Sequence, residues 1–260
     1  MQPPPDLFNI AGRVAIVTGA SSGLGEQFAK YLAAYGCTVV LVARRLKRLE
    51  QVAQTIIENK GTAFVQQCDV SVFEMVEATV KTVKEKFGRI DILVNNHGLA
   101  NSEPAEDQQL ENWHKIIDVD LHGTYYFARE VGKVMIEQKY GKIVNIASLH
   151  NNVVIHPSVQ KISAYASAKG GVQMLTKSLA AEWAQHGITV NAICPAYFQS
   201  EATADTISSP AFLQFVETRC PIGRIGRDGE LNGALHYFVS DASSYTTGQL
   251  LYVDGGWSCI

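Results

Sequence analysis

The stretch Val14-Ala-Ile-Val-Thr-Gly-Ala-Ser-Ser-Gly-Leu-Gly25 decides the fold of this chain. It starts with a short apolar run, which favours a buried strand, and glycines follow that run. Beyond them Leu24, Phe28 and Leu32 lie four residues apart, the spacing of one helical face. A glycine turn between a strand and a helix brings backbone N–H groups and the positive end of the helix dipole to a pyrophosphate. The stretch therefore indicates a dinucleotide-binding unit, with an ordinary tight turn as the alternative.

The same alternation of strand and helix continues along the whole chain. Short apolar runs rich in β-branched residues each precede a longer segment of helical period. They are Val14–Val17, Thr38–Val42, Ala63–Val65, Ile92–Val94, Ile143–Ile146, Val190–Ile193 and Leu250–Val253. No low-complexity linker interrupts them, and connections are short except around Leu149–Ser163 and Phe198–Arg227. We predict an α/β protein: a single Rossmann-type domain over residues 1–260, with a doubly wound parallel sheet of about seven strands and helices on both faces.

Composition excludes several classes of protein. With 260 residues, 47% of them hydrophobic and 18% charged, the chain can bury a full core. A net charge of −3 does not suit a general nucleic-acid or anionic-membrane binder, and no stretch approaches the ~20 apolar residues of a membrane span. Because Met1–Phe8 does not resemble a secretory signal, we expect a cytoplasmic protein. Five cysteines without a close pair indicate neither a disulfide framework nor a metal site.

The end of the second apolar run indicates which dinucleotide is bound. An NAD-binding unit places Asp or Glu there to accept from the ribose 2′-OH, whereas arginine suits a 2′-phosphate. Ala43 offers no carboxylate, and Arg44 and Arg45 offer two cations. The alternative is a solvated basic face on the next helix, which accounts in part for Lys47 or Arg48. The sequence favours NADP(H) over NAD(H).

The pair Tyr165 and Lys169 indicates proton transfer. In a helical segment running to about His186, the i, i+4 spacing puts the phenol and the ammonium on one face. A tyrosine pKa of ~10 is high for a base at neutral pH, and a nearby cation lowers it. Such a tyrosine can pass a proton to or from an alcohol oxygen. Taken alone, a tyrosine and a lysine at this spacing more often lie on a helix surface by chance than form a catalytic pair. The glycine loop upstream makes the catalytic interpretation the better one.

Together these motifs resemble the short-chain dehydrogenase/reductase family over nearly the whole chain. The matching segments are Thr18–Gly25 for the cofactor loop, Asn95-Asn96-His97-Gly98 for Asn-Asn-Ala-Gly, Ser148 for the catalytic serine, Tyr165–Lys169 for Tyr-x-x-x-Lys, Pro195-Ala196 for Pro-Gly, and Tyr252–Gly256 at the end. His97 and Ala196 depart from the family pattern.

The resemblance implies a role for each matching residue. Ser148 would hold the substrate oxygen, and Tyr165 would transfer the proton. Lys169 would bind the nicotinamide ribose and lower the pKa of Tyr165. Hydride would pass directly between nicotinamide and substrate carbon. The implied cofactor-binding residues are Gly19, Ser21, Ser22, Gly23, Leu24, Gly25, Arg44, Arg45, Asp69, Val70, Asn96, Gly98, Tyr165, Lys169, Pro195, Phe198 and Ser200. Among them Asp69 and Val70 would meet the adenine, Asn96 the adenosine ribose, and Phe198 and Ser200 the carboxamide.

The main departure is Asp120, where the family usually has Asn. In the family that asparagine stabilises a helix distortion whose carbonyl holds a water near the lysine. The backbone role can survive with Asp, which accepts hydrogen bonds as Asn does but does not donate them; the alternative is that the added charge near Lys169 raises the pKa of Tyr165. We expect Asp120 to be an altered catalytic member of this proton relay. His97 contacts the cofactor or is packed and hydrogen-bonded. His150 and His156 contact substrate or are solvated loop residues.

The resemblance leaves the substrate open. Asp6–Gly12, the loop from Ser148 to Tyr165 and Ala196–Thr203 look most like bacterial gluconate 5-dehydrogenase-type members, and 3-oxoacyl-carrier-protein reductases share most motifs. A keto sugar acid and a 3-oxoacyl compound are both candidates, although no cluster of basic residues in the loops indicates a carboxylate or a carrier protein. The family also implies a homotetramer built from two long helices and the last strand. A catalytically weakened dinucleotide sensor is the alternative function, favoured by Asp120 and Ala196 and opposed by the intact Ser148, Tyr165 and Lys169.

Overall fold

One parallel sheet organises the chain, as predicted. The computed structural model describes residues 6–199, 203 and 207–260. Within these residues seven strands lie in the order β3-β2-β1-β4-β5-β6-β7, all paired in parallel. Their bounds are β1 Val14–Thr18, β2 Thr38–Ala43, β3 Thr62–Gln67, β4 Ile92–Asn95, β5 Gly141–Ile146, β6 Ile188–Pro195 and β7 Leu250–Val253.

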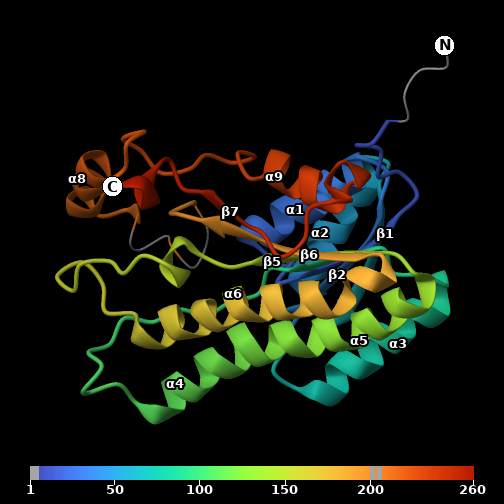
Figure 1. The fold of residues 1–260 in the computed structure, drawn as a ribbon, viewed down its shortest axis with the longest axis horizontal. Helices are drawn as coiled ribbons and strands as arrows, with labels where there is room; N and C mark the ends of the chain where they lie inside the picture. Colours follow the sequence, from blue (N-terminus) through green and yellow to red (C-terminus); the bar gives the residue numbers. More distant parts are fainter. Residues whose placement is uncertain (1–5, 200–202, 204–206) are drawn as a thin grey trace.

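Helices cover both faces of this sheet (Figure 1). The described helices are α1 Gly23–Ala34, α2 Leu46–Glu58, α3 Phe73–Phe87, α4 Leu110–Ile117, α5 Gly123–Gln138, α6 Ser163–Trp183, α8 Pro210–Arg219 and α9 Asn232–Val239. The first face packs against α1, α2 and α9, and the second against α3, α5 and α6. Because both faces are covered, β1, β4, β5 and β6 are buried along their whole length, which explains why their sequences are mainly apolar.

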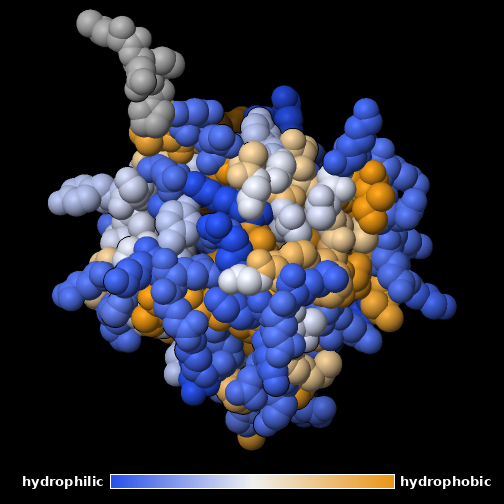
Figure 2. All heavy atoms as spheres, turned by 90° about the vertical axis from the view of Figure 1, so that its right-hand side faces the viewer, coloured by the Kyte–Doolittle hydropathy of each residue, from blue (hydrophilic) through white to orange (hydrophobic). Residues whose placement is uncertain are grey.

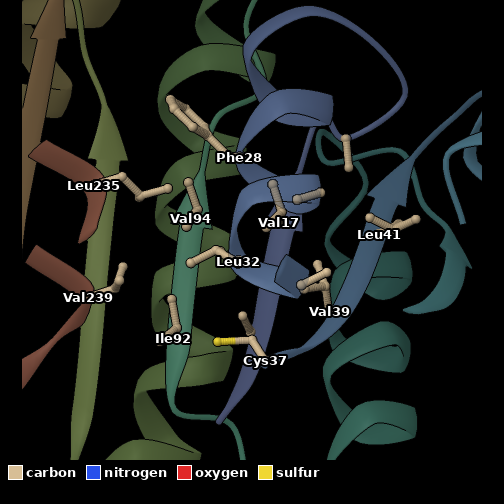
Figure 3. Packing of buried hydrophobic residues seen from close by; sticks show 14 of the residues in the cluster. Val17, Phe28, Leu32, Cys37, Val39, Leu41, Ile92, Val94, Leu235 and Val239 are labelled. Carbon is tan, nitrogen blue, oxygen red and sulfur yellow. The ribbon is translucent and has the colours of Figure 1, made fainter. Parts of the chain in front are cut away.

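The predicted first βα unit is present. Phe28 and Leu32 of α1 lie over the sheet beside Val17 and Val94, where Leu235 of α9 also approaches (Figure 3). Gly36 follows the helix in the left-handed region, with φ +83°. This conformation suits glycine and ends the helix, so the chain turns directly into β2.

The topology fixes where a ligand can bind. Strand order reverses between β1 and β4, and α/β sheets bind ligands at the carboxyl ends of strands around such a switch point. In Figure 1 the carboxyl ends of β6 and β7 point to the end of the molecule where α8 and the C-terminus lie. The opposite end faces the viewer in Figure 2 and shows mainly hydrophilic residues with smaller hydrophobic areas between them.

None of the described helices combines the length and the apolar character that crossing a membrane requires.

Candidate active site

The glycine loop after β1 forms a cradle that side chains would fill. Gly19 has φ +64°, and a Cβ built on it would lie 2.9 Å from Asn96 Nδ2. A Cβ on Gly25 would lie 2.3 Å from the carbonyl oxygen of Gly19. The Asn96 amide donates to the carbonyls of Thr18 at 3.2 Å and Gly19 at 3.4 Å. The loop is therefore held in place at the start of α1, where the helix N-terminus fits a pyrophosphate.

Two arginines border the β2 side of this cradle. Arg45 donates to the hydroxyls of Ser21 at 3.1 Å and Ser22 at 2.7 Å. The side chain of Arg44 is 57% exposed, and its Nη1 lies 3.9 Å from Asp69 Oδ2. Burial would raise the pKa of Asp69, but hydrogen bonds from Ser71 and the charge of Arg44 lower it. The positive corner predicted from the sequence thus forms beside the loop serines.

Tyr165 and Lys169 lie in the first two turns of α6 and face β5. The Lys169 ammonium is 5.6 Å from the centre of the Tyr165 ring and donates to the Ile146 carbonyl at 3.1 Å. Ser148, just beyond β5, is 5% exposed, and its Oγ accepts from the backbone N–H of His150 at 3.1 Å. The serine, tyrosine and lysine of the sequence motifs therefore meet at the carboxyl edge of the sheet.

The pKa of Tyr165 is raised, contrary to the lowering expected from the lysine. Burial is the largest cause; the charge of Lys169 lowers the pKa, Asp120 raises it, and an interaction with Ser148 lowers it. The expected influence of Lys169 is present, but burial and the carboxylate outweigh it. The sequence showed the cation beside the phenol but not how deeply both are buried.

Asp120 touches Lys169 directly. It lies in a π-helical turn, Asp118–His122, and is fully buried. One oxygen accepts from the Leu99 N–H at 2.7 Å, and the other lies 3.3 Å from Lys169 Nζ. Burial would lower the pKa of Lys169, but Asp120 holds it above its ordinary value. A Cβ at Gly98 would lie 3.2 Å from Asp120 Oδ2 and 3.4 Å from Lys169 Nζ, so the glycine leaves room for this pair.

His97 is a packed, hydrogen-bonded side chain. Its Nδ1 lies 2.7 Å from the Thr18 hydroxyl, and its Nε2 lies 3.4 Å from the Thr124 hydroxyl. Burial, together with the charge of Lys169, lowers its pKa to about 3, so the ring is neutral at physiological pH. It joins the end of β1 to α5.

An aromatic and aliphatic cluster packs against Tyr165. His150 is buried, with its ring 6.5 Å from that of Tyr165 in an edge arrangement, whereas His156 is exposed and bonded to Ser158. The cluster includes Leu149, Ile155, Ile162, Tyr197, Phe212, Val216, Cys220 and Trp257. Sequence reasoning missed Tyr197 and Trp257; their positions directly after the Pro195-Ala196 and Asp254–Gly256 motifs were the available signal.

The remaining predicted cofactor residues are placed as follows. Val70 is buried, and its side chain would meet a Cβ at Gly123. Pro195 ends β6. The Phe198 ring is 6% exposed and packs on Gly226, which leaves only its backbone to meet a carboxamide. Ser200 lies outside the described residues.

Known proteins match this chain over almost its full length. The family model described as enoyl-(acyl carrier protein) reductase matches residues 19–258. Gluconate 5-dehydrogenase of Gluconobacter oxydans is 37% identical over 97% of both chains, and the 3-oxoacyl-[acyl-carrier-protein] reductase of Synechocystis is 37% identical over 95% of this chain and 97% of its own. A galactitol 2-dehydrogenase (L-tagatose-forming) of Cereibacter sphaeroides is 33% identical over 97% of both chains.

The crystal structure of a gluconate 5-dehydrogenase from Burkholderia cenocepacia, in complex with NADP and tartrate, superposes with a TM-score of 0.94. It is 34% identical over 98% of both chains. These full-length matches lead to one conclusion: the chain belongs to the short-chain dehydrogenase/reductase family of oxidoreductases.

Proposed function

We propose that this chain is an NADP(H)-dependent oxidoreductase that interconverts a carbonyl and a secondary alcohol, with Tyr165 as the proton donor and acceptor. The observation that carries the proposal is the convergence of Ser148, Tyr165 and Lys169 beside the glycine cradle. When bound, the nicotinamide supplies or accepts the hydride.

Each side chain has a definable task. The Ser148 oxygen accepts the His150 N–H, and its O–H, which lies beside Tyr165, donates to a substrate oxygen. In the reducing direction Tyr165 gives its phenolic proton to the oxygen that gains negative charge, and in the oxidising direction its phenolate removes the alcohol proton. Lys169, held charged by Asp120, stabilises that phenolate.

The preference for NADP(H) rests on the two arginines. Arg45 lies on the hydroxyls of Ser21 and Ser22, and Arg44 lies beside Asp69. No carboxylate takes the place of Ala43 at the end of β2. A 2′-phosphate entering this corner meets two guanidinium groups, whereas a 2′-OH finds no carboxylate at the end of β2.

The relatives' names supply the first substrates to try: a keto sugar acid, a 3-oxoacyl compound and a hexitol. A homotetramer and a cytoplasmic location complete the proposal. Light scattering of the purified protein tests the former, and cell fractionation tests the latter.

The test is the oxidation of NADPH, followed by absorbance, by purified protein with a panel of ketones, keto sugar acids, ketoses and 3-oxoacyl esters. We expect turnover with at least one class and a higher kcat/KM with NADPH than with NADH. Protein that binds NADPH without turning over any member would favour the sensor alternative. Equal use of both cofactors would contradict the role of the arginines.

A further inference from the structure

His97 lies between the end of β1 and the π-helical turn Asp118–His122, here called the Asp120 turn. Its Nδ1 is 2.7 Å from the hydroxyl of Thr18, the last residue of β1, and its Nε2 is 3.4 Å from the hydroxyl of Thr124. Thr124 lies in the first turn of α5, which directly follows the Asp120 turn. One side chain therefore contacts both the strand that leads into the glycine cradle and the helix that follows the Asp120 turn.

The hydrogen bonds around this ring have a definite direction. The Thr124 hydroxyl donates to the Asp120 carbonyl at 2.7 Å, so its oxygen accepts the proton of His97 Nε2. With the ring proton on Nε2, Nδ1 is an acceptor. The Thr18 hydroxyl donates to it, since Nδ1 is nearer, at 2.7 Å, than the Val94 carbonyl, at 3.2 Å. His97 thus completes a chain of hydrogen bonds from β1 to the backbone of the Asp120 turn.

The surrounding backbone leaves just enough room for this side chain. A Cβ at Gly123, the first residue of α5, would lie 3.0 Å from His97 Nε2. On the other side, a Cβ at Gly19 would lie 3.0 Å from His97 Cα. His97, Thr18 and Thr124 are all buried, so bulk water does not compete for their hydrogen bonds.

His97 does not titrate at neutral or alkaline pH. Burial is the main cause that lowers its pKa to about 3. Of the two charged groups that act on the ring, Lys169 of α6 lowers this pKa further and Asp69 raises it, as does a hydrogen bond with the Val119 backbone. A change that a His97 variant makes in a pH profile at neutral or alkaline pH therefore reports on another group.

The Asp120 turn determines where the Asp120 carboxylate lies. One carboxylate oxygen is 3.3 Å from Lys169 Nζ, and the residue is fully buried. Because a π-helical turn is rare, contacts from outside the helix help to maintain it. The His97 ring supports the backbone of this turn directly at Val119 and, through the Thr124 hydroxyl, at the Asp120 carbonyl.

Building on the proposed function, we propose that His97 is a positioning residue for the reaction: it holds the Asp120 turn so that the Asp120 carboxylate stays against Lys169. Without the imidazole the turn can relax, and the carboxylate moves away from the ammonium. Because Asp120 raises the pKa of Tyr165, its displacement lets the phenolate form at lower pH.

The experiment measures the pH dependence of alcohol oxidation at saturating NADP⁺ in His97→Ala, in Asp120→Asn and in the double variant. The substrate is the alcohol that corresponds to the best carbonyl compound of the panel. In His97→Ala the limb on which kcat/KM rises with pH should move to lower pH, less far than in Asp120→Asn, with a severalfold gain in activity on that limb. In the double variant the limb should stay where Asp120→Asn puts it, because His97 acts through the carboxylate.

Conservative substitutions separate the two ends of the link. The amide of His97→Gln reaches the place of Nε2 and should restore most of the wild-type profile. The shorter amide of His97→Asn reaches only the place of Nδ1, so this variant should behave like His97→Ala.

Thr124→Val breaks the link at α5 with little change in side-chain shape, and it should also move the limb to lower pH. Thr79→Val, at a buried threonine of α3, is its matched control and should leave the limb in place. Thr124→Val takes the place of His97→Ala in every comparison if the latter does not fold.

Thermal unfolding of the protein without cofactor gives a readout that is independent of activity. His97→Ala and Asp120→Asn should each lower the Tm, and together they should lower it by less than the two losses added, because residues of one network are coupled. His97→Ala combined with Thr79→Val should give additive losses.

A limb that stays in place in folded His97→Ala or Thr124→Val would overturn the inference while leaving the oxidoreductase function intact. Additive losses of Tm for His97→Ala and Asp120→Asn would do the same. Wild-type protein that turns over no substrate would instead overturn the proposed function and, with it, the role of His97 in the reaction. The unfolding comparison would still decide whether His97 holds Asp120 in place.

Discussion

Replacing Asp120 with Asn removes one buried charge beside Lys169. Asp120 Oδ2 lies 3.3 Å from Lys169 Nζ, which is 5.6 Å from the centre of the Tyr165 ring, so the carboxylate is within about 9 Å of that ring. At an effective dielectric constant of ~20, a unit charge at ~9 Å contributes about 2 kcal/mol. Because Asp120 raises the pKa of Tyr165, its removal should favour the phenolate by about that amount.

The assay is the pH dependence of alcohol oxidation, which requires the phenolate as base. The limb on which kcat/KM rises with pH should move to lower pH in Asp120→Asn, and activity on that limb should increase about tenfold or more. Asp118→Asn is the matched control, since Asp118 lies in the same π-helical turn but is about half exposed and bonded to His122.

Thermal unfolding must accompany this assay, because the variant leaves Lys169 buried without its counter-charge. Losing one partner of a buried ion pair costs about 3–5 kcal/mol, so the Tm should fall. A profile that stays in place, or moves to higher pH, in folded Asp120→Asn would refute the electrostatic reasoning. A large loss of kcat in folded protein would show that the carboxylate has a task of its own.

Three further changes test other parts of the account. In a fluorescence titration, Arg45→Ala should weaken NADPH binding about 10- to 100-fold, which is the contribution of one or two charge-assisted hydrogen bonds. NADH binding should stay nearly unchanged. Lys47→Ala, at an exposed lysine, is the control. Gly25→Ala should abolish NADPH binding, because the new Cβ would lie 2.3 Å from a carbonyl oxygen. Calorimetry should show a loss of folding stability of about 1–3 kcal/mol. The control Gly233→Ala should not destabilise the protein, because no atom lies within 4 Å of its new Cβ. Native protein should show one rapidly reacting thiol, the exposed Cys259, since the other four cysteines are buried; fast reaction of a second thiol would contradict the packing.

The sequence predicted the sheet well because its inner strands, β2, β1, β4, β5 and β6, are buried on both faces. All seven apolar runs are strands, and most strands extend one or two residues beyond the run. The extensions are polar or small residues such as Thr18, Asn95 and Gly141, which backbone pairing retains although their side chains give no apolar signal.

The sequence identifies the candidate catalytic residues by their types and spacing, but it does not predict their electrostatics. An i, i+4 rule places Tyr165 and Lys169 on one face, yet the raised pKa of Tyr165 depends on burial and on Asp120, which is distant in sequence. The direct Asp120–Lys169 contact likewise depends on the π-helical turn and on the space left by Gly98. Tertiary packing of this kind is not contained in a local pattern.

The histidines show the same limit. The sequence left both a ligand and a packed residue open for His97, and only the distances to Thr18 and Thr124 show the packed arrangement. His150 was one of two loop histidines of equal standing. The fold buries it beside Tyr165 and leaves His156 exposed.

The most direct test of the central claim is a comparison of wild-type protein with Tyr165→Phe, at saturating NADPH and with the best substrate of the panel. The variant keeps the ring that packs in the cluster and loses only the hydroxyl. We predict that the variant still binds NADPH and that its kcat falls by at least about 10²-fold, the lower range for a positioned general acid. Undiminished turnover in Tyr165→Phe would contradict the account, because the proton would then come from another group.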